Sequence, residues 1–283
     1  MRPIALVLAL VAGMNAPPAT FAAAPDTSAL DRARRAYNAG RYDAAIGAAR
    51  HALDVPDHVD AARLVLARAL LERYRASSLP GDLVEARDAL RAISLPGLPQ
   101  TERYELMVGF GQWLFLTGRF GAAAELFDAA LGSGGRAPAG SRDRLLDWWA
   151  SALDRQVHEP GGEAAELYGR VLERMELEAR RDPSSAAAAY WIAAAARGLG
   201  RLDRAWQAAM AAWVRTGLTQ ERADALRADL DRLVLTGIIP DRARGIGPAR
   251  SGRREAADTM ITDWERFKAD WEPSPPAPSS QQQ

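Results

Sequence analysis

Apolar and polar positions follow one another along most of this chain with the three- and four-residue spacing of amphipathic helices. A representative stretch has apolar side chains at Leu64, Ala67, Leu70, Leu71 and Tyr74. β-Branched residues are sparse, and no alternating run of four or more residues predicts a strand. Alanine and leucine, both strong helix formers, dominate instead. The pattern predicts an all-α protein over residues 26–235.

Turn residues divide this helical region into five hairpins. Their inner turns are expected near Gly40, Gly81, Gly118, Gly161 and Gly200. Three of these glycines open nearly the same motif: a bulky apolar residue follows two positions later, and an alanine three positions after that. The motif pairs are Tyr42 with Ala45, Phe120 with Ala123, and Leu202 with Ala205. Internal repetition of this kind predicts a stack of helical hairpins, each packed on its neighbours.

These units resemble tetratricopeptide repeats, which place small residues in both helices and a glycine at the inner turn. The third unit matches best, with Gly111, Leu114, Gly118, Phe120, Ala123, Phe127 and Ala130. The first unit matches with Ala33, Ala36, Gly40, Tyr42, Ala45, Ala49 and Ala52, and the fifth with Ala193, Ala196, Gly200, Leu202, Ala205, Ala209 and Ala212. The resemblance implies a right-handed α-solenoid of about five hairpins. The small residues are expected to let paired helices approach closely.

The spacing of the repeats departs from that family, whose units are about 34 residues long. The interval from Gly40 to Gly81 is 41 residues, and that from Gly81 to Gly118 is 37. Two units occupy the 82 residues from Gly118 to Gly200. Some helices or loops must therefore be longer, so the curvature of the stack does not carry over from the family.

In tetratricopeptide proteins the first helices of successive units line a concave groove that binds peptides. Carried over unit by unit, the resemblance implies groove positions at Arg34, Tyr37, Asn38, Glu105, Gln112, Phe115, Tyr190 and Arg197. Arginine and aromatic side chains are common binding anchors. We therefore expect a protein or peptide partner in the groove. The alternative is that these residues are ordinary surface positions.

The C-terminal part is expected to contain a sixth helix over residues 221–235, a basic Gly/Pro linker over 236–252 and a final amphipathic helix over 253–272. One face of the final helix carries Met260, Trp264, Phe267 and Trp271. This face predicts a cap on the end of the array, which helical stacks require. The alternative is a docking surface in which Trp264, Phe267 and Trp271 contact a partner. Membrane contact is disfavoured because the polar face is more acidic than basic.

Both ends of the chain differ from the helical region. Residues 1–24 have the layout of a secretory signal peptide, with Arg2 before an apolar run and cleavage expected near Ala22. The run is shorter than the about 20 apolar residues that span a bilayer. The chain has no cysteine, so neither lipoprotein acylation nor a disulfide is expected. We expect an exported protein, periplasmic or secreted, with a disordered tail over 273–283.

Charge and motifs narrow the function. Basic and acidic side chains balance to a formal net charge of zero, which gives no reason to expect nucleic acid as a partner. Motifs of serine hydrolases, zinc proteases and P-loop enzymes are absent from the sequence. The His51–Asp60 segment is rich in histidine and aspartate, but a solvated turn is expected there and not a metal site.

We therefore expect a protein–protein interaction scaffold of the bacterial cell envelope, without catalysis, cofactor or metal. Two other functions stay open at this point. One is a structural subunit of an envelope complex that assembles through its ends and its C-terminal helix. The other is a helical protein that binds a glycan or another small ligand.

Overall fold

The computed structural model describes residues 28–133, 141–218, 223–246 and 250–271. The predicted signal peptide and the predicted disordered tail lie outside these residues. Within them every regular element is a helix and there is no strand. The prediction of an all-α protein is therefore confirmed for the described part of the chain.

The helices come in pairs along the chain. The pairs are α1 (Ala29–Asn38) with α2 (Tyr42–Ala52), α3 (Val59–Ser77) with α4 (Pro80–Arg91), α5 (Gln100–Leu116) with α6 (Phe120–Gly132), α7 (Ser141–Val157) with α8 (Ala164–Arg181), and α9 (Ala186–Gly198) with α10 (Leu202–Arg215). They are followed by α11 (Ala223–Leu233), the π-helical turn η3 (Val234–Ile238), α12 (Ile239–Gly245) and α13 (Arg250–Asp270). Short 3₁₀ turns, η1 (Pro56–His58) and η2 (Thr216–Leu218), follow α2 and α10. The five pairs match the five predicted hairpins, and we call their members first and second helices.

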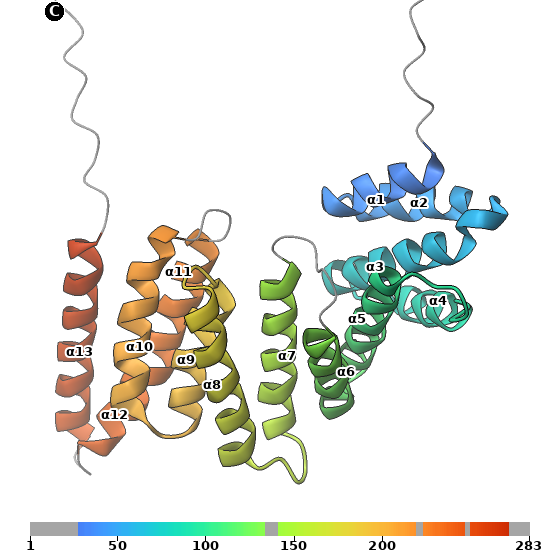
Figure 1. Ribbon diagram of the computed structural model, residues 1–283. Helices are drawn as coiled ribbons and strands as arrows, with labels where there is room; N and C mark the ends of the chain where they lie inside the picture. Colours follow the sequence, from blue (N-terminus) through green and yellow to red (C-terminus); the bar gives the residue numbers. More distant parts are fainter. Residues whose placement is uncertain (1–27, 134–140, 219–222, 247–249, 272–283) are drawn as a thin grey trace, which may run out of the picture.

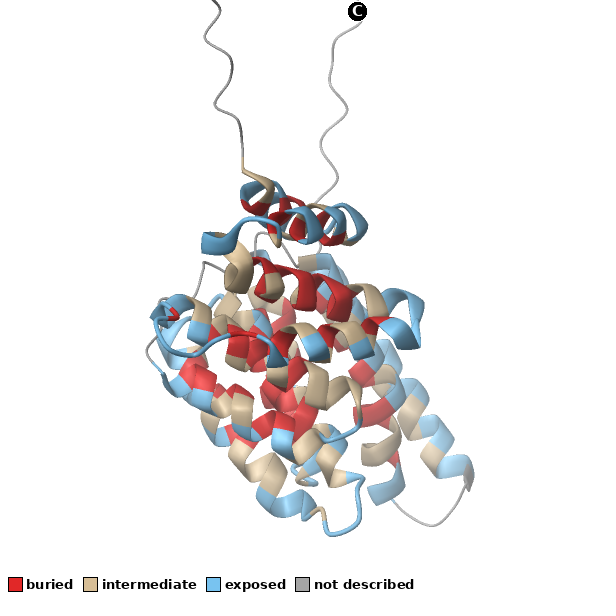
Figure 2. Ribbon diagram, turned by 90° about the vertical axis from the view of Figure 1, so that its right-hand side faces the viewer, coloured by how far each residue is buried: buried red, intermediate tan, exposed pale blue. Residues whose placement is uncertain are grey.

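Most contacts join helices that are close in the chain. The two helices of each pair pack together, and each second helix packs on the next helix that follows it. Consecutive first helices also contact one another, from α1 through α3, α5, α7 and α9 to α11. Figure 1 shows the outcome, with α1 and α2 lying across the direction of α7–α13. Buried residues run through the interior of the layers in Figure 2.

Three of the inner turns have the same backbone conformation. Gly40, Gly118 and Gly200 have φ values of 70°, 78° and 70°, a left-handed conformation in which a side chain would be strained. The residue after each glycine donates its N–H to a carbonyl five positions earlier. These bonds are Arg41 to Ala36 (2.9 Å), Arg119 to Leu114 (2.8 Å) and Arg201 to Ala196 (2.9 Å). The repeated motif is thus a repeated helix C-cap.

The second hairpin turns differently. Its left-handed residue is Ser78, with φ of 56°, and α4 already begins at Pro80. Gly81 therefore lies in the first turn of a helix, and the turn predicted at this glycine is located instead at Ser78. Proline suits the first helical turn because its missing N–H would have no helical partner there.

Small residues mark the closest approach of paired helices, as expected. Gly111 of α5 is buried, and a Cβ atom on it would lie 2.5 Å from Cε1 of Phe127 in α6. The Phe127 ring is itself fully buried. Ala123 and Ala130 are buried on the same helix as Phe127. The missing side chain at Gly111 is therefore the space that the Phe127 ring occupies.

Helix α13 covers the C-terminal end of the array. Trp264 is fully buried, and its ring packs edge-on against Trp206 and Trp213 with centroid distances of 5.9 and 5.4 Å. Its Nε1 donates to Asp231 Oδ1 at 2.9 Å. This arrangement agrees with the interpretation of the last helix as a cap.

The linker predicted over 236–252 is largely helical in its described residues, 236–246 and 250–252. The chain continues from α11 through the π-helical turn η3 into α12, which contains Pro240 near its start. Gly237 in this turn leaves room for Arg197, whose Nε would lie 2.8 Å from a Cβ at that position. Gly237 therefore serves helix packing, and Pro240 lies in the first turn of α12. Helix α13 begins at Arg250, earlier than expected.

We predict that Gly111→Ala lowers the free energy of unfolding by about 1–3 kcal/mol, because the added methyl group overpacks the contact with Phe127. Gly47→Ala is the matched control, since Gly47 lies inside α2 and a Cβ atom added there would have nothing within 4 Å. This control should gain about 0.5–1 kcal/mol from helix propensity. Urea unfolding followed by circular dichroism measures both, and equal effects would contradict the packing argument.

Candidate functional site

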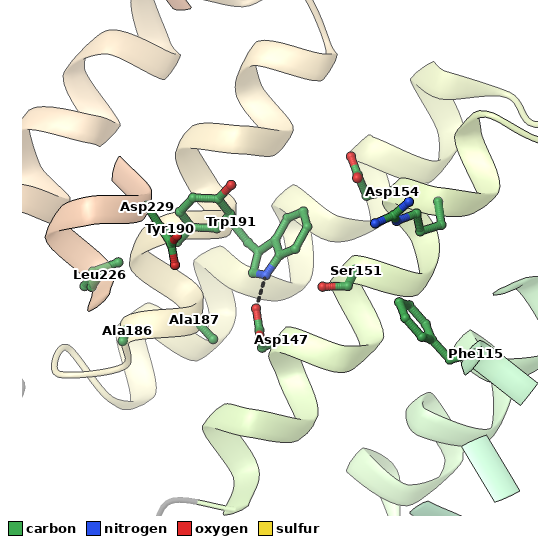
Figure 3. Close-up of a pocket in the computed structure, with 11 residues that line it drawn as sticks. Phe115, Asp147, Ser151, Asp154, Ala186, Ala187, Tyr190, Trp191, Leu226 and Asp229 are labelled. Carbon is green, nitrogen blue, oxygen red and sulfur yellow. Dashed lines mark hydrogen bonds between the residues drawn. The ribbon is translucent and has the colours of Figure 1, made fainter. Parts of the chain in front are cut away.

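Two cavities are lined by first helices and α11, and no residue of a second helix lines either one. The C-terminal cavity has a volume of about 290 Å³ and is lined by Phe115, Asp147, Ser151, Asp154, Arg155, Ala186, Ala187, Tyr190, Trp191, Leu226 and Asp229 (Figure 3). The N-terminal cavity has a volume of about 50 Å³ and is lined by Tyr37, Arg68, Tyr104, Glu105, Val108, Gln112, Ser141, Arg144, Leu145 and Trp148.

Five of the eight predicted groove residues line these cavities. Tyr37, Glu105 and Gln112 belong to the N-terminal cavity. Phe115 and Tyr190 belong to the C-terminal cavity, where Figure 3 draws them on opposite sides of Ser151. The structure thus brings the predicted residues together in two groups, not in one continuous pocket.

The other three predicted residues line neither cavity. Arg34 forms an ion pair with Glu102 at 3.1 Å, and Arg197 forms one with Asp241 at 2.7 Å. Arg34 therefore connects α1 to α5, and Arg197 connects α9 to α12. Asn38 is exposed at the end of α1.

The N-terminal cavity is nearly filled by its own side chains. The Arg68 guanidinium lies over the Tyr37 ring at 4.7 Å and pairs with Glu105 at 3.1 Å. The Gln112 Nε2 atom donates to Glu72 at 3.3 Å. Arg68 Nε and Gln112 Oε1 are buried without a hydrogen-bond partner in the described part of the chain. The Arg68 and Glu105 charges compensate each other, and the remaining volume accommodates water molecules but no long side chain.

The C-terminal cavity is both larger and acidic. Asp147 and Asp154 of α7 line it together with Asp229 of α11. Asp147 Oδ1 accepts a hydrogen bond from Trp191 Nε1 at 3.0 Å, drawn as a dashed line in Figure 3. Asp154 Oδ1 accepts one from the Tyr168 hydroxyl at 2.8 Å. Both carboxylates are therefore oriented by neutral donors.

A glycine secures the position of Tyr168. A Cβ atom on Gly198 would lie 2.4 Å from Cδ2 of Tyr168, so the ring packs directly on the backbone of α9. Burial raises the pKa of the Tyr168 hydroxyl, as does its hydrogen bond to Asp154. The hydroxyl therefore stays protonated and keeps donating to the carboxylate.

Tyr190 reports the electrostatic field of the cavity. Burial raises the pKa of its hydroxyl to about 12, and the negative charges of Asp229, Asp154 and Asp147 add to the rise. The positive charge of Arg232 acts in the opposite direction. The field at this ring is therefore negative, as it would be in a site that accepts positive charge.

The three residues predicted to dock a partner through the last helix are placed very differently. Trp264 is fully buried in the core, so it has no surface to offer. Phe267 is half-buried against Trp264, with a centroid distance of 5.7 Å. Trp271 is 52% exposed. The face that predicted docking is mostly used to close the array.

Sequence reasoning missed the carboxylates of the C-terminal cavity. Asp143, Asp147 and Asp154 are spaced by four and seven residues, which places them on one face of α7. This polar stripe, beside the buried Trp148 and Trp149, is the local signal that points to α7. The contribution of Asp229, on α11, depends on helix stacking and has no local signal.

In the comparison with known proteins, no family model and no curated protein matches the chain. Among the described residues, no helix is both long and apolar enough to cross a lipid bilayer. No group of three or more His, Cys, Asp or Glu side chains in the same residues is placed to hold a metal ion.

We predict that Asp229→Asn lowers the pKa of Tyr190 from about 12, because it removes the largest of the three carboxylate contributions. The pKa should stay above 10, since burial is the main cause of the shift. Ultraviolet titration of tyrosinate, with Tyr190→Phe as the reference, measures the pKa. The control is Asp88→Asn, which replaces an exposed carboxylate and should leave the pKa of Tyr190 unchanged.

The same shift makes stability depend on alkaline pH. The unfolded chain releases the Tyr190 proton near pH 10, whereas the folded chain holds it to about pH 12. The free energy of unfolding should therefore fall as pH rises from 10 to 12, by about 1.4 kcal/mol for each pH unit. Urea unfolding of the wild type should show this loss, and Tyr190→Phe should lack the contribution. Identical pH profiles would contradict the assignment.

Proposed function

We propose that this chain is a non-catalytic interaction scaffold that binds a segment of a partner protein along its first helices. One observation supports the proposal above the others: both cavities are lined by first helices and α11, and second helices contribute nothing to either. A face built from one member of each pair extends along the whole stack. Such a face is suited to an extended or helical peptide.

The finer architecture belongs to this proposal. We infer an α-solenoid of tetratricopeptide type, in which the first helices form the concave face. The repeated glycine C-caps and the contacts between consecutive first helices support the inference. The wide spacing of the units sets it apart from the family pattern, so the shape of the face is specific to this chain. The placement in the bacterial envelope rests on the N-terminal residues of the sequence alone.

The binding face offers aromatic anchors along its length. Tyr37 and Phe115 lie on α1 and α5, and each lines a different cavity. Tyr190 lies further along, on α9. A partner segment that follows the stack would pass all three. The two alternative functions predict different contacts. A structural subunit that assembles through its ends would use Trp271 at the contact. A protein that binds a small ligand would use a single cavity.

Site-specific photo-crosslinking in the native host tests the proposal. A benzoyl-phenylalanine at Tyr37 and another at Phe115 should capture the same partner protein, because both positions contact one bound segment. Val84 is the matched control, since it is 52% exposed on the second helix α4. Trp271 tests assembly through the last helix. Adducts from Trp271 or Val84 without adducts from Tyr37 and Phe115 would contradict the proposal.

A further inference from the structure

Among the residues that the structure describes, most buried and half-buried carboxylates form an ion pair with arginine or lysine. In the described part of the chain, the buried and half-buried carboxylates without an ion pair are Asp143, Asp147 and Asp154, all on α7. Leaving a charge half-buried and unpaired is costly, so exceptions require a reason. The concentration of the exceptions on one helix points to one site.

The lack of an ion pair at Asp143 is explained by its contacts within the fold. Its carboxylate accepts hydrogen bonds from Ser185 Oγ and from the backbone N–H of Ala187, at the start of α9. A helix N-terminus carries partial positive charge, which compensates a carboxylate placed there. Asp143 therefore serves as a link between α7 and α9.

Asp147 and Asp154 have no such compensation. Each uses Oδ1 to accept one bond from a neutral donor, Trp191 or Tyr168, and neither Oδ2 atom has a partner among the described residues. The donors hold the two carboxylates in place without neutralising their charge. Arg155 also lines the cavity but is exposed and forms no ion pair within the described residues.

The space in front of these carboxylates matches a long cationic side chain. The C-terminal cavity has a volume of about 290 Å³, near the lower end of the ~300–1,000 Å³ range of ligand pockets. Phe115 and Tyr190 contribute rings, which attract cations through their faces. Asp229 adds a third carboxylate at the wall, although it pairs with Arg232 at 3.2 Å. Burial is the main cause of the raised pKa of Tyr190, and the negative charges of the three carboxylates add to it.

In the N-terminal cavity, by contrast, a carboxylate is neutralised by an arginine of the same chain. There Arg68 lies over the Tyr37 ring and pairs with Glu105, so an arginine of the chain already occupies the space between an aromatic ring and a carboxylate. The C-terminal cavity has aromatic rings and carboxylates of the same kind, but no arginine or lysine of the described chain forms an ion pair with Asp147 or Asp154.

We propose that the C-terminal cavity receives an arginine or lysine side chain of the partner segment, held by Asp147 and Asp154 and flanked by Phe115 and Tyr190. This inference rests on the proposed function, because it names the chemistry that one part of the binding face selects. It assigns the partner a basic residue at the position that reaches α7 and α9.

Replacing Asp147 and Asp154 with asparagine tests the effect of their negative charges separately from that of their shape. Asparagine keeps a side-chain oxygen that accepts the bonds from Trp191 and Tyr168, so Asp147→Asn with Asp154→Asn removes the negative charges and keeps the shape. The matched control is Asp54→Asn with Asp57→Asn, which removes two exposed carboxylates far along the chain. Both double variants change the net charge equally.

Selection of random dodecapeptides displayed on phage against the wild-type protein provides the probe. We expect enriched peptides to share an arginine or lysine. Synthetic copies should bind the Asp147→Asn, Asp154→Asn variant about tenfold or more weakly in fluorescence anisotropy, because a desolvated charge pair is lost. The Asp54→Asn, Asp57→Asn control should bind like the wild type, and replacing the basic residue with glutamine should match the loss.

Other results overturn the inference. Enrichment without a basic residue, no enrichment, or equal affinity for the two double variants would each do so. Crosslinking from Tyr37 and Phe115 decides the proposed function separately, so a groove that binds a neutral segment would be recognised as such.

Thermal unfolding without peptide distinguishes a binding role from a structural one. The Asp147→Asn, Asp154→Asn variant should have a Tm equal to or above that of the wild type, because two uncompensated charges are removed. A lower Tm would show that the carboxylates stabilise the fold, and the inference would fail.

Discussion

The close approach of consecutive helices is the constraint on which the rest of this structure depends. Phe127 occupies the space that a side chain at Gly111 would need, and Tyr168 occupies the space beside Gly198. Where one partner is reduced to a hydrogen atom, an aromatic ring can lie against helix backbone and bury its whole face. The pairs pack with each first helix in contact with the next first helix along the chain.

That arrangement creates sites from residues far apart in the chain. Asp147 and its donor Trp191 are separated by 44 positions, as are Arg197 and Asp241. Both pairs join a helix to one that comes roughly one unit later. The Asp147–Trp191 contact has a double role, because it joins two first helices and places both side chains at the wall of the C-terminal cavity. Gly198 illustrates the link, since it seats Tyr168 and thereby orients Asp154.

The two cavities are lined by similar residue types but differ in whether their carboxylates are neutralised. In the N-terminal cavity a cation of the chain lies between an aromatic ring and a carboxylate, and little space remains. In the C-terminal cavity the carboxylates are oriented but not neutralised, and the space is larger. These differences in charge and volume are the basis for proposing the second cavity, and not the first, as a binding position.

By itself the sequence determined the helices, four of the five inner turns and the small residues at helix contacts. These features depend on local periodicity and on backbone angles that glycine alone adopts easily. The repeat register also led to Tyr37, Phe115 and Tyr190 as groove positions, and all three line one of the two cavities. Only the tertiary structure decided that Trp264 is buried, that Arg34 and Arg197 are paired, and that the Gly237–Pro240 segment is helical. Those outcomes depend on how far each helix shifts and turns against its neighbours, and no local pattern encodes that offset.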